Sequence, residues 1–180
     1  MDAYNGISLW QRELPGANRF SPGREGGPAC LDEHRLYFAI TNHCAVFNAA
    51  SGAPLATFSG PAAYAHDEWG FIAVQGGLLF GTKQPAGASF RTRNTSWNIE
   101  KLNPRSMWNA TAAEFAVSRC VFALDKTNGQ PRWVYGDGQR AVLNTGIAIS
   151  SNTVFLIESR VPAVIADADG SVGLRAFMQT

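Results

Sequence analysis

The sequence predicts an all-β protein made of repeated short strands, and three observations lead to this fold class. A nine-residue pattern occurs twice in register, as DAYNGISLW from Asp2 to Trp10 and as DKTNGQPRW from Asp125 to Trp133. A weaker copy, NAASGAPLA, runs from Asn48 to Ala56. In addition, 18 glycines and 9 prolines in 180 residues suit many short strands joined by turns.

Each copy of the pattern predicts a β-hairpin. The Asn-Gly or Ser-Gly pair at its centre accepts the positive φ that tight turns require. Residues with high β propensity flank the last copy, from Val121 to Leu124 before the turn and from Arg132 to Tyr135 after it. We expect the large apolar group that ends a complete copy, Trp10 or Trp133, to pack between one repeat and the next.

The interval between copies sets the size of the repeating unit. Gly6 and Gly52 are 46 positions apart, and Gly52 and Gly129 are 77 positions apart. The second interval is longer because of an insertion at residues 85–118, which adds about 35 residues to one repeat and leaves 77 − 35 = 42. A period in the forties with four short strands per unit is typical of the blades of a β-propeller.

The apolar segments predict a β-propeller of four-stranded antiparallel blades, with two complete and two incomplete blades in a single partial domain over residues 1–180. The expected strands are 7–14 in the first unit, 28–32, 35–41, 44–49 and 54–59 in the second, 69–74, 78–83, 119–125 and 131–136 in the third, and 145–150, 153–159 and 161–166 in the last. Propellers need about four to eight blades to close. We therefore expect the sequence to be a piece of a larger protein, whose remaining blades would be its first partners.

Charge and composition exclude several classes of function. The formal net charge of +1 gives no electrostatic case for binding nucleic acid or an anionic membrane. No apolar run approaches the roughly 20 residues that span a bilayer. Cys30, Cys44 and Cys120 form no Cys-x-x-Cys pair, so neither a zinc site nor a redox motif is predicted. We expect buried free thiols, with a Cys30–Cys44 disulfide as the alternative in an exported protein.

The last copy resembles the tryptophan-docking repeat of the pyrroloquinoline-quinone-type, or quinoprotein-like, β-propellers, in which an alanine, an aspartate, a glycine and a tryptophan recur at the spacing of Ala123, Asp125, Gly129 and Trp133. The middle copy departs from that repeat, with Ala56 in place of tryptophan. The resemblance implies that the tryptophan stacks between the glycine of its own motif and the alanine of a neighbouring blade. The structural positions that it assigns are Asp2, Gly6, Trp10, Asn48, Gly52, Ala123, Asp125, Gly129 and Trp133.

Two functions follow from this resemblance. The first is a non-catalytic binding or scaffold propeller, and the alternative is a fragment of a pyrroloquinoline-quinone-dependent alcohol or sugar dehydrogenase. The dehydrogenases resemble one another in a disulfide between adjacent cysteines, a calcium held by glutamate, asparagine and aspartate, and an aspartate base. No two cysteines are adjacent here and the acidic residues have no recognisable calcium spacing. The sequence therefore predicts no catalytic residue and no metal site in this piece, and it favours the scaffold.

Other polar residues are interpreted as structural. The acidic residues are expected to be solvated turn or strand-end residues, and the histidines are too dispersed for a metal site or a catalytic triad. These residues are Asp67, Glu68, Asp137, Glu158, Asp167 and Asp169, with His34, His43 and His66. WD40 and kelch propellers share the period and remain distant alternatives, although no Trp-Asp pair ends a strand and the Gly76-Gly77 pair occurs without the partners typical of kelch.

The insertion is the best candidate for a ligand contact, because long loops over a rigid scaffold commonly carry function. It contains Arg91, Arg93 and Trp97, followed by Lys101, Arg105 and Trp108. Cations beside aromatic faces bind sugars, quinones or anionic groups. The alternative is a loop whose tryptophans cover the apolar surface of a blade. A protein partner or a small ligand is expected, and export to the periplasm or cell surface follows from the resemblance, although no signal peptide is visible.

Overall fold

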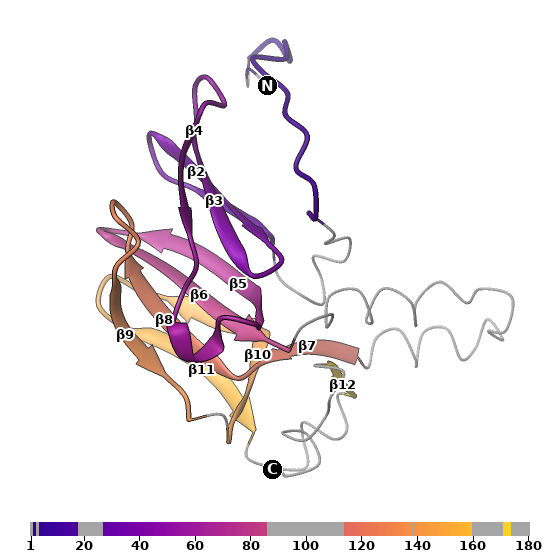
Figure 1. Ribbon diagram of the computed structural model, residues 1–180, viewed down its shortest axis with the longest axis vertical. Coiled ribbons are helices and arrows are strands. Elements are labelled where there is room, and N and C mark those ends of the chain that lie inside the picture. Colours follow the sequence, from indigo (N-terminus) through magenta and orange to yellow (C-terminus); the bar gives the residue numbers. More distant parts are fainter. Residues whose placement is uncertain are drawn as a thin grey trace, which may run out of the picture.

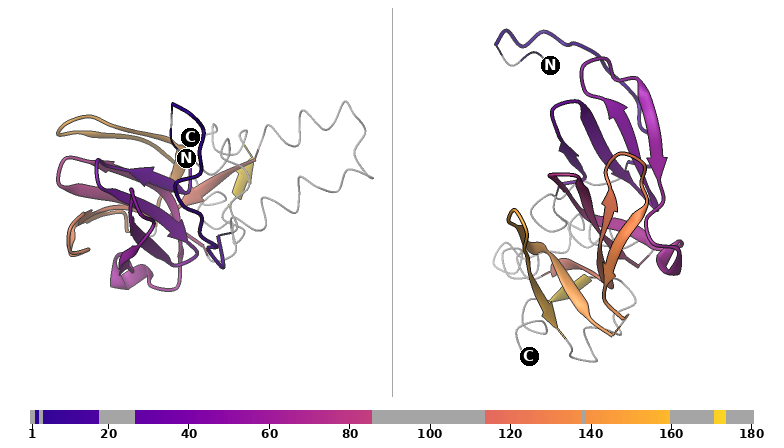
Figure 2. Two further views of the ribbon diagram at one scale, coloured as in Figure 1. Left: turned by 90° about the horizontal axis from the view of Figure 1, so that it is seen from above. Right: turned by 90° about the vertical axis from the view of Figure 1, so that its left-hand side faces the viewer.

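The protein is all-β, and the computed structural model describes residues 2, 4–17, 27–85, 114–137, 139–159 and 171–173. Three four-stranded sheets are present in this part of the chain, and a short 3-10 helix, η1 (Ala62–Tyr64), joins the first sheet to the second. The first sheet lies beside the second, and the second lies beside the third (Figures 1 and 2). No helix in the described ranges is long and apolar enough to cross a membrane.

The first complete blade is an antiparallel meander in the order β1-β2-β3-β4. Its strands are β1 (Ala29–Leu31), β2 (Arg35–Ile40), β3 (His43–Asn48) and β4 (Pro54–Phe58). Each boundary lies within one residue of the range predicted from the sequence. Local turn chemistry explains this agreement, because Asp32 Oδ1 accepts the N–H groups of His34 and Arg35 and so ends β1 at the expected turn.

The second complete blade has the same antiparallel order, β5-β6-β8-β9. Its strands are β5 (Glu68–Gln75), β6 (Leu78–Gln84), β8 (Cys120–Asp125) and β9 (Pro131–Tyr135). Strand β6 pairs with β8 along its length, from Leu78 opposite Asp125 to Lys83 opposite Cys120, although the predicted insertion separates them in sequence. The two complete blades confirm the predicted fold class, a partial β-propeller of four-stranded antiparallel blades.

The third sheet differs from the prediction. Its strands are β10 (Ala141–Ile149), β11 (Val154–Ser159), β7 (Glu114–Ser118) and β12 (Ser171–Gly173), and their order is β11-β10-β7-β12. The first two strands were expected, whereas β7 comes from the C-terminal end of the predicted insertion and pairs with β10 through Val142 opposite Ser118. The expected third strand, 161–166, lies outside the described residues, as do 86–113 of the insertion.

Residues 7–14 are extended but form no strand, which corrects the prediction for the first unit. A strand needs a neighbouring backbone to pair with, and this segment forms no backbone ladder with any described strand. Side chains hold it instead, because the Trp10 indole donates to Ala49 O at 2.9 Å and Arg12 Nε donates to Gly52 O at 3.1 Å. The segment therefore lies along the first complete blade, as Figure 1 shows in indigo.

The hydrophobic core of the described chain lies between the two complete blades, where side chains of the first sheet meet those of the second. Trp69 of β5 is fully buried and meets Phe122 of β8 edge-on, with ring centroids 4.9 Å apart. Tyr37 of β2 is also fully buried, and its hydroxyl reaches Lys126 O of the second blade at 3.3 Å. Because the strands alternate inward and outward side chains, each blade presents one apolar face to the blade that follows it.

The pairing registers align the two complete blades residue by residue. Arg35 lies opposite Asn48 in the first blade, and Leu78 lies opposite Asp125 in the second. Tyr37 is therefore the counterpart of Phe80. The two side chains lie on equivalent faces of their sheets, because successive side chains along a strand alternate between the faces.

Candidate binding site: the inter-blade docking faces

The repeated motif forms the same turn three times. In each copy the first residue, Asp2, Asn48 or Asp125, accepts on Oδ1 the N–H groups of the residues two and three positions later. Its own N–H donates to the carbonyl five positions later, and the glycine N–H donates back to its carbonyl at 2.8 to 3.0 Å. The motif is therefore a self-contained side-chain-capped turn between the third and fourth strands of a unit.

The glycine of the turn is a docking surface for an aromatic ring. Gly52 has φ of +68°, and a Cβ added there would lie 2.6 Å from the Trp10 ring. The indole of Trp10 therefore lies flat against the glycine of the following copy. The resemblance implied contact with its own glycine, Gly6, but four extended residues place Trp10 about 13 Å farther along the chain. The next blade is within reach, whereas the turn of its own copy is not.

The joint between the two complete blades uses phenylalanine in place of the missing tryptophan. A Cβ at Gly129, whose φ is +74°, would overlap the Phe58 ring, with Cε1 only 2.8 Å away. Phe58 is 5% exposed and lies two residues after Ala56, the position where the motif has tryptophan. Because side chains alternate along a strand, residues two apart share a face, and Phe58 fills the same space. Phe58 was not identified from the sequence. Its position two residues after Ala56, on the same face of the strand, could have identified it as the docking residue.

The third aromatic of this series has no turn against it among the described residues. Trp133 of β9 is 36% exposed, with its ring centroid 6.0 Å from that of Phe80. It borders an apolar groove of about 480 Å³ between β9 and the β10–β11 hairpin. The lining residues are Val121, Trp133, Tyr135, Asn152, Val154 and Leu156. Phe58 and Trp10 each contact the unit that follows their own. Trp133 lies on the equivalent side of its blade, so it faces the unit that follows the second complete blade.

A polar cluster closes one end of this groove. Tyr135 OH donates to Glu158 Oε2 at 3.0 Å, and Arg140 Nη1 donates to Glu158 Oε1 at 2.9 Å. The Arg140 guanidinium also lies over the Tyr135 ring, 5.0 Å from its centroid. These contacts fix the position of β9 relative to β11, so the groove has a defined width.

A second polar cluster lies where the second blade meets the third sheet, and it is fully buried. Ser118 Oγ lies 2.6 Å from Asn144 Oδ1 and 2.9 Å from Thr82 Oγ1, and Asn144 Nδ2 donates to Gln84 Oε1 at 2.9 Å. A Cβ at Gly70 would lie 2.6 Å from Asn144 Nδ2 and 2.7 Å from Ser118 Oγ. The four side chains satisfy one another, so they connect β6, β7 and β10. Nothing in the sequence spacing predicted this cluster.

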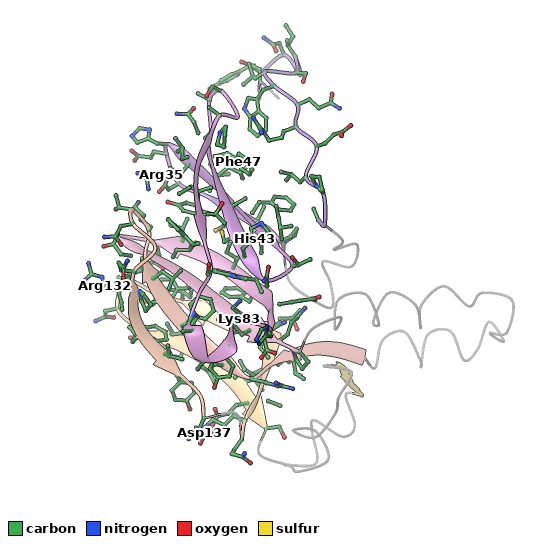
Figure 3. The ribbon with its side chains drawn as sticks, viewed as in Figure 1. Arg35, His43, Phe47, Lys83, Arg132 and Asp137 are labelled. Atoms are coloured by element: carbon green, nitrogen blue, oxygen red, sulfur yellow. The ribbon has the colours of Figure 1, made fainter. Side chains whose placement is uncertain are left out.

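Lys83 connects the first complete blade to the second. Its side chain is fully buried, and Nζ donates to Asn42 O at 2.9 Å and to Asp67 O at 3.0 Å, while the Trp69 indole also donates to Asn42 O at 3.1 Å. Figure 3 shows Lys83 where these two sheets meet. Burial, partly offset by the charge of Asp67, lowers the pKa of Lys83 to about 8. These contacts hold the β2–β3 turn against the second blade.

Asp67 lies beside this lysine. Burial raises the pKa of its carboxyl group, and the Arg119 guanidinium, 3.5 Å away, opposes that rise. Its Oδ2 is buried and accepts no hydrogen bond in the described part of the chain. Asp67 was predicted to be a solvated turn residue, but it is only 9% exposed, and the Arg119 guanidinium lies beside its carboxyl group.

A second, charged groove of about 530 Å³ lies where the two complete blades meet, at the end opposite Lys83. It is bounded by the β1–β2 turn and the turns of the second blade. Lys126 Nζ lies 2.9 Å from Asp32 Oδ2 across it. Burial opposes ionisation of Asp32, but hydrogen bonds from Lys126 and from the N–H groups of His34 and Arg35 hold its pKa below its usual range. The ion pair between Lys126 and Asp32 therefore joins the two blades at this groove.

The other sequence-predicted residues do not converge on a site. His34 is exposed, with Glu33 3.9 Å away, and Asp137 pairs with Arg140 at 3.7 Å. The ligand-contact candidates Arg91, Arg93 and Trp97, together with Lys101, Arg105, Trp108, Asp167 and Asp169, lie outside the described residues. Within the described ranges no three histidine, cysteine or acidic side chains cluster in a way that could hold a metal ion.

All three thiols are free in the structure, and Cys44 and Cys120 are fully buried. Burial raises the pKa of Cys30 and of Cys120 to about 12. Thiols with such values are unreactive at neutral pH, which agrees with a packing role for both.

Comparison with known proteins adds little to this picture. No protein-family model matches the sequence, and no curated protein matches it either. Among solved structures, a europium-containing methanol dehydrogenase is similar at a TM-score of 0.28 and 6% identity, over 63% of this chain. This chain spans only 32% of that dehydrogenase. The fold assignment therefore rests on the sheets and turns described above.

Proposed function

We propose that the chain is a non-catalytic, quinoprotein-like β-propeller scaffold that binds a protein partner through the groove between β9 and the β10–β11 hairpin. The observation that carries this proposal is the position of Trp133, an aromatic docking residue that lies exposed beside an apolar groove. Its counterpart at the preceding joint, Phe58, is covered by a turn. Exposed aromatics in a defined groove are typical of the centres of protein interfaces.

The buried polar groups support a scaffold because they are used to join blades. Lys83 holds the β2–β3 turn of the first blade. Asn144 connects the second blade to the third sheet through Thr82 and Gln84. Such satisfied inter-blade contacts make the docking faces rigid, and a rigid surface loses less entropy when it binds.

The competing function, a fragment of a pyrroloquinoline-quinone-dependent dehydrogenase, rests on the resemblance of the repeat. That cofactor pair would need carboxylate and amide oxygens converging on calcium. In the described ranges, arginines engage the relevant carboxylates: Arg119 pairs with Asp67, and Arg140 pairs with Asp137 and Glu158. Carboxylates that pair with arginine in this way do not fit the set of converging oxygen ligands that calcium and the quinone would require.

One pair of measurements separates the two functions. The 180-residue chain, mixed with pyrroloquinoline quinone and calcium, should not reduce a redox dye when alcohols or aldoses are added. It should bind the apolar fluorescent probe anilinonaphthalene sulfonate in the groove, and Leu156→Ser should weaken that binding severalfold. The matched control is Leu55→Ser on β4, which is 50% exposed and belongs to a different sheet from β9 and β11. Quinone-dependent dye reduction would refute the scaffold function.

A further inference from the structure

Two of the three side-chain-capped turns contain an Asn-Gly pair, and the chemistry of this pair makes each turn a candidate site of backbone modification. The pairs are Asn5-Gly6 and Asn128-Gly129, whereas the middle turn has Ser51-Gly52. In an Asn-Gly pair the backbone nitrogen of glycine can attack the side-chain carbonyl carbon of asparagine, because glycine has no Cβ to obstruct the approach. Serine has no side-chain amide, so the middle turn lacks this reaction.

The reaction is spontaneous and consumes only water. The glycine nitrogen loses its proton to solvent and forms a bond to Cγ of asparagine. The bond from Cγ to the side-chain nitrogen breaks, and that nitrogen takes up a proton and leaves as ammonia, so a succinimide ring remains. Water then opens the ring at either of its two carbonyl carbons. One product is aspartate, and the other is isoaspartate, in which the backbone runs through the former side chain.

The two Asn-Gly turns have the same local geometry, so local structure gives them similar reactivity. The asparagine Oδ1 accepts the N–H group two positions later at 2.9 Å in both turns, from Ile7 and from Gln130. The glycine N–H donates to the carbonyl of the first motif residue, at 3.0 Å for Gly6 and 2.8 Å for Gly129. Their φ values are +71° and +74°. This N–H must leave its carbonyl before the nitrogen can attack, so the reaction requires the turn to open.

Tertiary contacts hold the second of these turns closed. A Cβ at Gly129 would overlap the ring of Phe58, which is only 5% exposed. Arg35 of the first complete blade donates through Nη1 to Lys126 O at 2.9 Å, and the Lys126 N–H donates to Gly77 O at 3.0 Å. Opening this turn therefore disturbs hydrogen bonds to two other strands' turns and exposes a buried aromatic ring.

The first Asn-Gly turn is open to solvent in the described part of the chain. Nothing lies within 4 Å of a Cβ at Gly6. Tyr4 is 100% exposed and Ile7 is 63% exposed. Opening this turn breaks hydrogen bonds within the motif itself, and water can replace them at little net cost.

We propose that Asn5 is a site of spontaneous deamidation and isoaspartate formation in the folded protein, and that the docking of Phe58 protects Asn128 from the same reaction. The reactive open turn is rare at Asn128, because a buried ring must first leave its place. Isoaspartate at position 5 lengthens the backbone of the turn and removes the geometry that holds the Gly6 N–H against Asp2 O. The modification therefore alters a turn whose two counterparts each receive an aromatic ring, and it does not depend on the proposed scaffold function.

Peptide mass spectrometry of the 180-residue chain, incubated at mildly alkaline pH, measures both deamidation rates. Asn5 should deamidate at least about tenfold faster than Asn128, because exposure of a buried phenylalanine makes the open turn at least that much rarer. The matched control is the chain unfolded in guanidinium chloride, where the two rates should be similar because both asparagines precede glycine. Asn5→Gln should abolish the signal at position 5, since glutamine would have to form a larger ring that closes more slowly.

Two variants test the protection of Asn128. Phe58→Leu keeps an apolar side chain but removes the ring, and Arg35→Met removes a hydrogen bond to the same turn without changing the ring. Each should raise the Asn128 rate severalfold, whereas Leu55→Ala, at an exposed position of the same strand, should change neither rate. Circular dichroism shows whether each variant remains folded. An Asn5 rate no faster than that of Asn128 in the folded chain, or an Asn128 rate unchanged in both folded variants, would overturn the inference.

Discussion

Gly129→Ala should destabilise the protein far more than the same replacement at Gly76. Both glycines have positive φ, +74° and +58°, so each alanine costs about 1–2 kcal/mol of backbone strain. At Gly76 the added methyl group meets open space. At Gly129 it overlaps the buried Phe58 ring, which adds about 1–3 kcal/mol of overpacking. The free energy of unfolding should therefore fall by about 2–5 kcal/mol in Gly129→Ala and by about 1–2 kcal/mol in Gly76→Ala.

Urea unfolding followed by circular dichroism measures both values. With a denaturant slope of about 2 kcal/mol per molar, an excess of 2 kcal/mol lowers the unfolding midpoint by about 1 M. A Phe58→Leu background should remove most of that excess, because a smaller side chain leaves room for the methyl group. Equal destabilisation in Gly129→Ala and Gly76→Ala would refute the docking of Phe58 on the turn.

Three further predictions concern the polar contacts. Gly70→Ala pushes a methyl group into the cluster of Thr82, Ser118 and Asn144, so it should cost at least about 2 kcal/mol of unfolding free energy, against under about 0.5 kcal/mol for Gly77→Ala, where the space is open. Lys83 has a folded pKa of about 8 and an ordinary value of 10.5, so above pH 8 the folded chain releases a proton that the unfolded chain keeps. Stability therefore rises with pH, and from pH 7 to pH 9 the wild type should gain about 1 kcal/mol relative to Lys83→Met in thermal or urea unfolding; a constant difference would contradict the buried, protonated lysine. Asp32 has a folded pKa below its ordinary value, so the stability it contributes is present above about pH 4 and is lost as the pH falls further. The gap between the urea midpoints of the wild type and Asp32→Asn should accordingly narrow steadily as the pH falls from 4 to 2, and a gap that stays constant over this range would argue against the Asp32–Lys126 ion pair.

Sequence reasoning was most reliable where the controlling interactions are local. The three turns were predicted from an acidic or amide residue, a glycine four positions later and the flanking apolar segments. The structure shows that all of the capping bonds lie within the motif itself. Local chemistry also explains the strand boundaries at the hairpin turns of the complete blades, because the residues of those turns adjoin the strands in sequence.

Sequence reasoning was weaker for contacts between units. The expected strand at 7–14 is unpaired in the described chain, since a strand depends on a neighbour that local sequence does not specify. The insertion was expected to be a loop over one blade, yet its last residues form β7, which pairs with β10 of the third sheet. The polar cluster around Asn144 unites residues from three strands that no motif connects.

The sequence by itself determined the repeat and the hairpin turns, because the repeat is a pattern of residue types and each turn depends on residues within about ten positions of one another. Only the tertiary structure decided which ring docks on which turn. Trp10 meets the glycine of the following copy, Phe58 replaces the missing tryptophan, and Trp133 is left beside a groove. The physical reason is that docking depends on how far an extended strand carries a side chain and on where the next sheet lies, and distant backbone sets both.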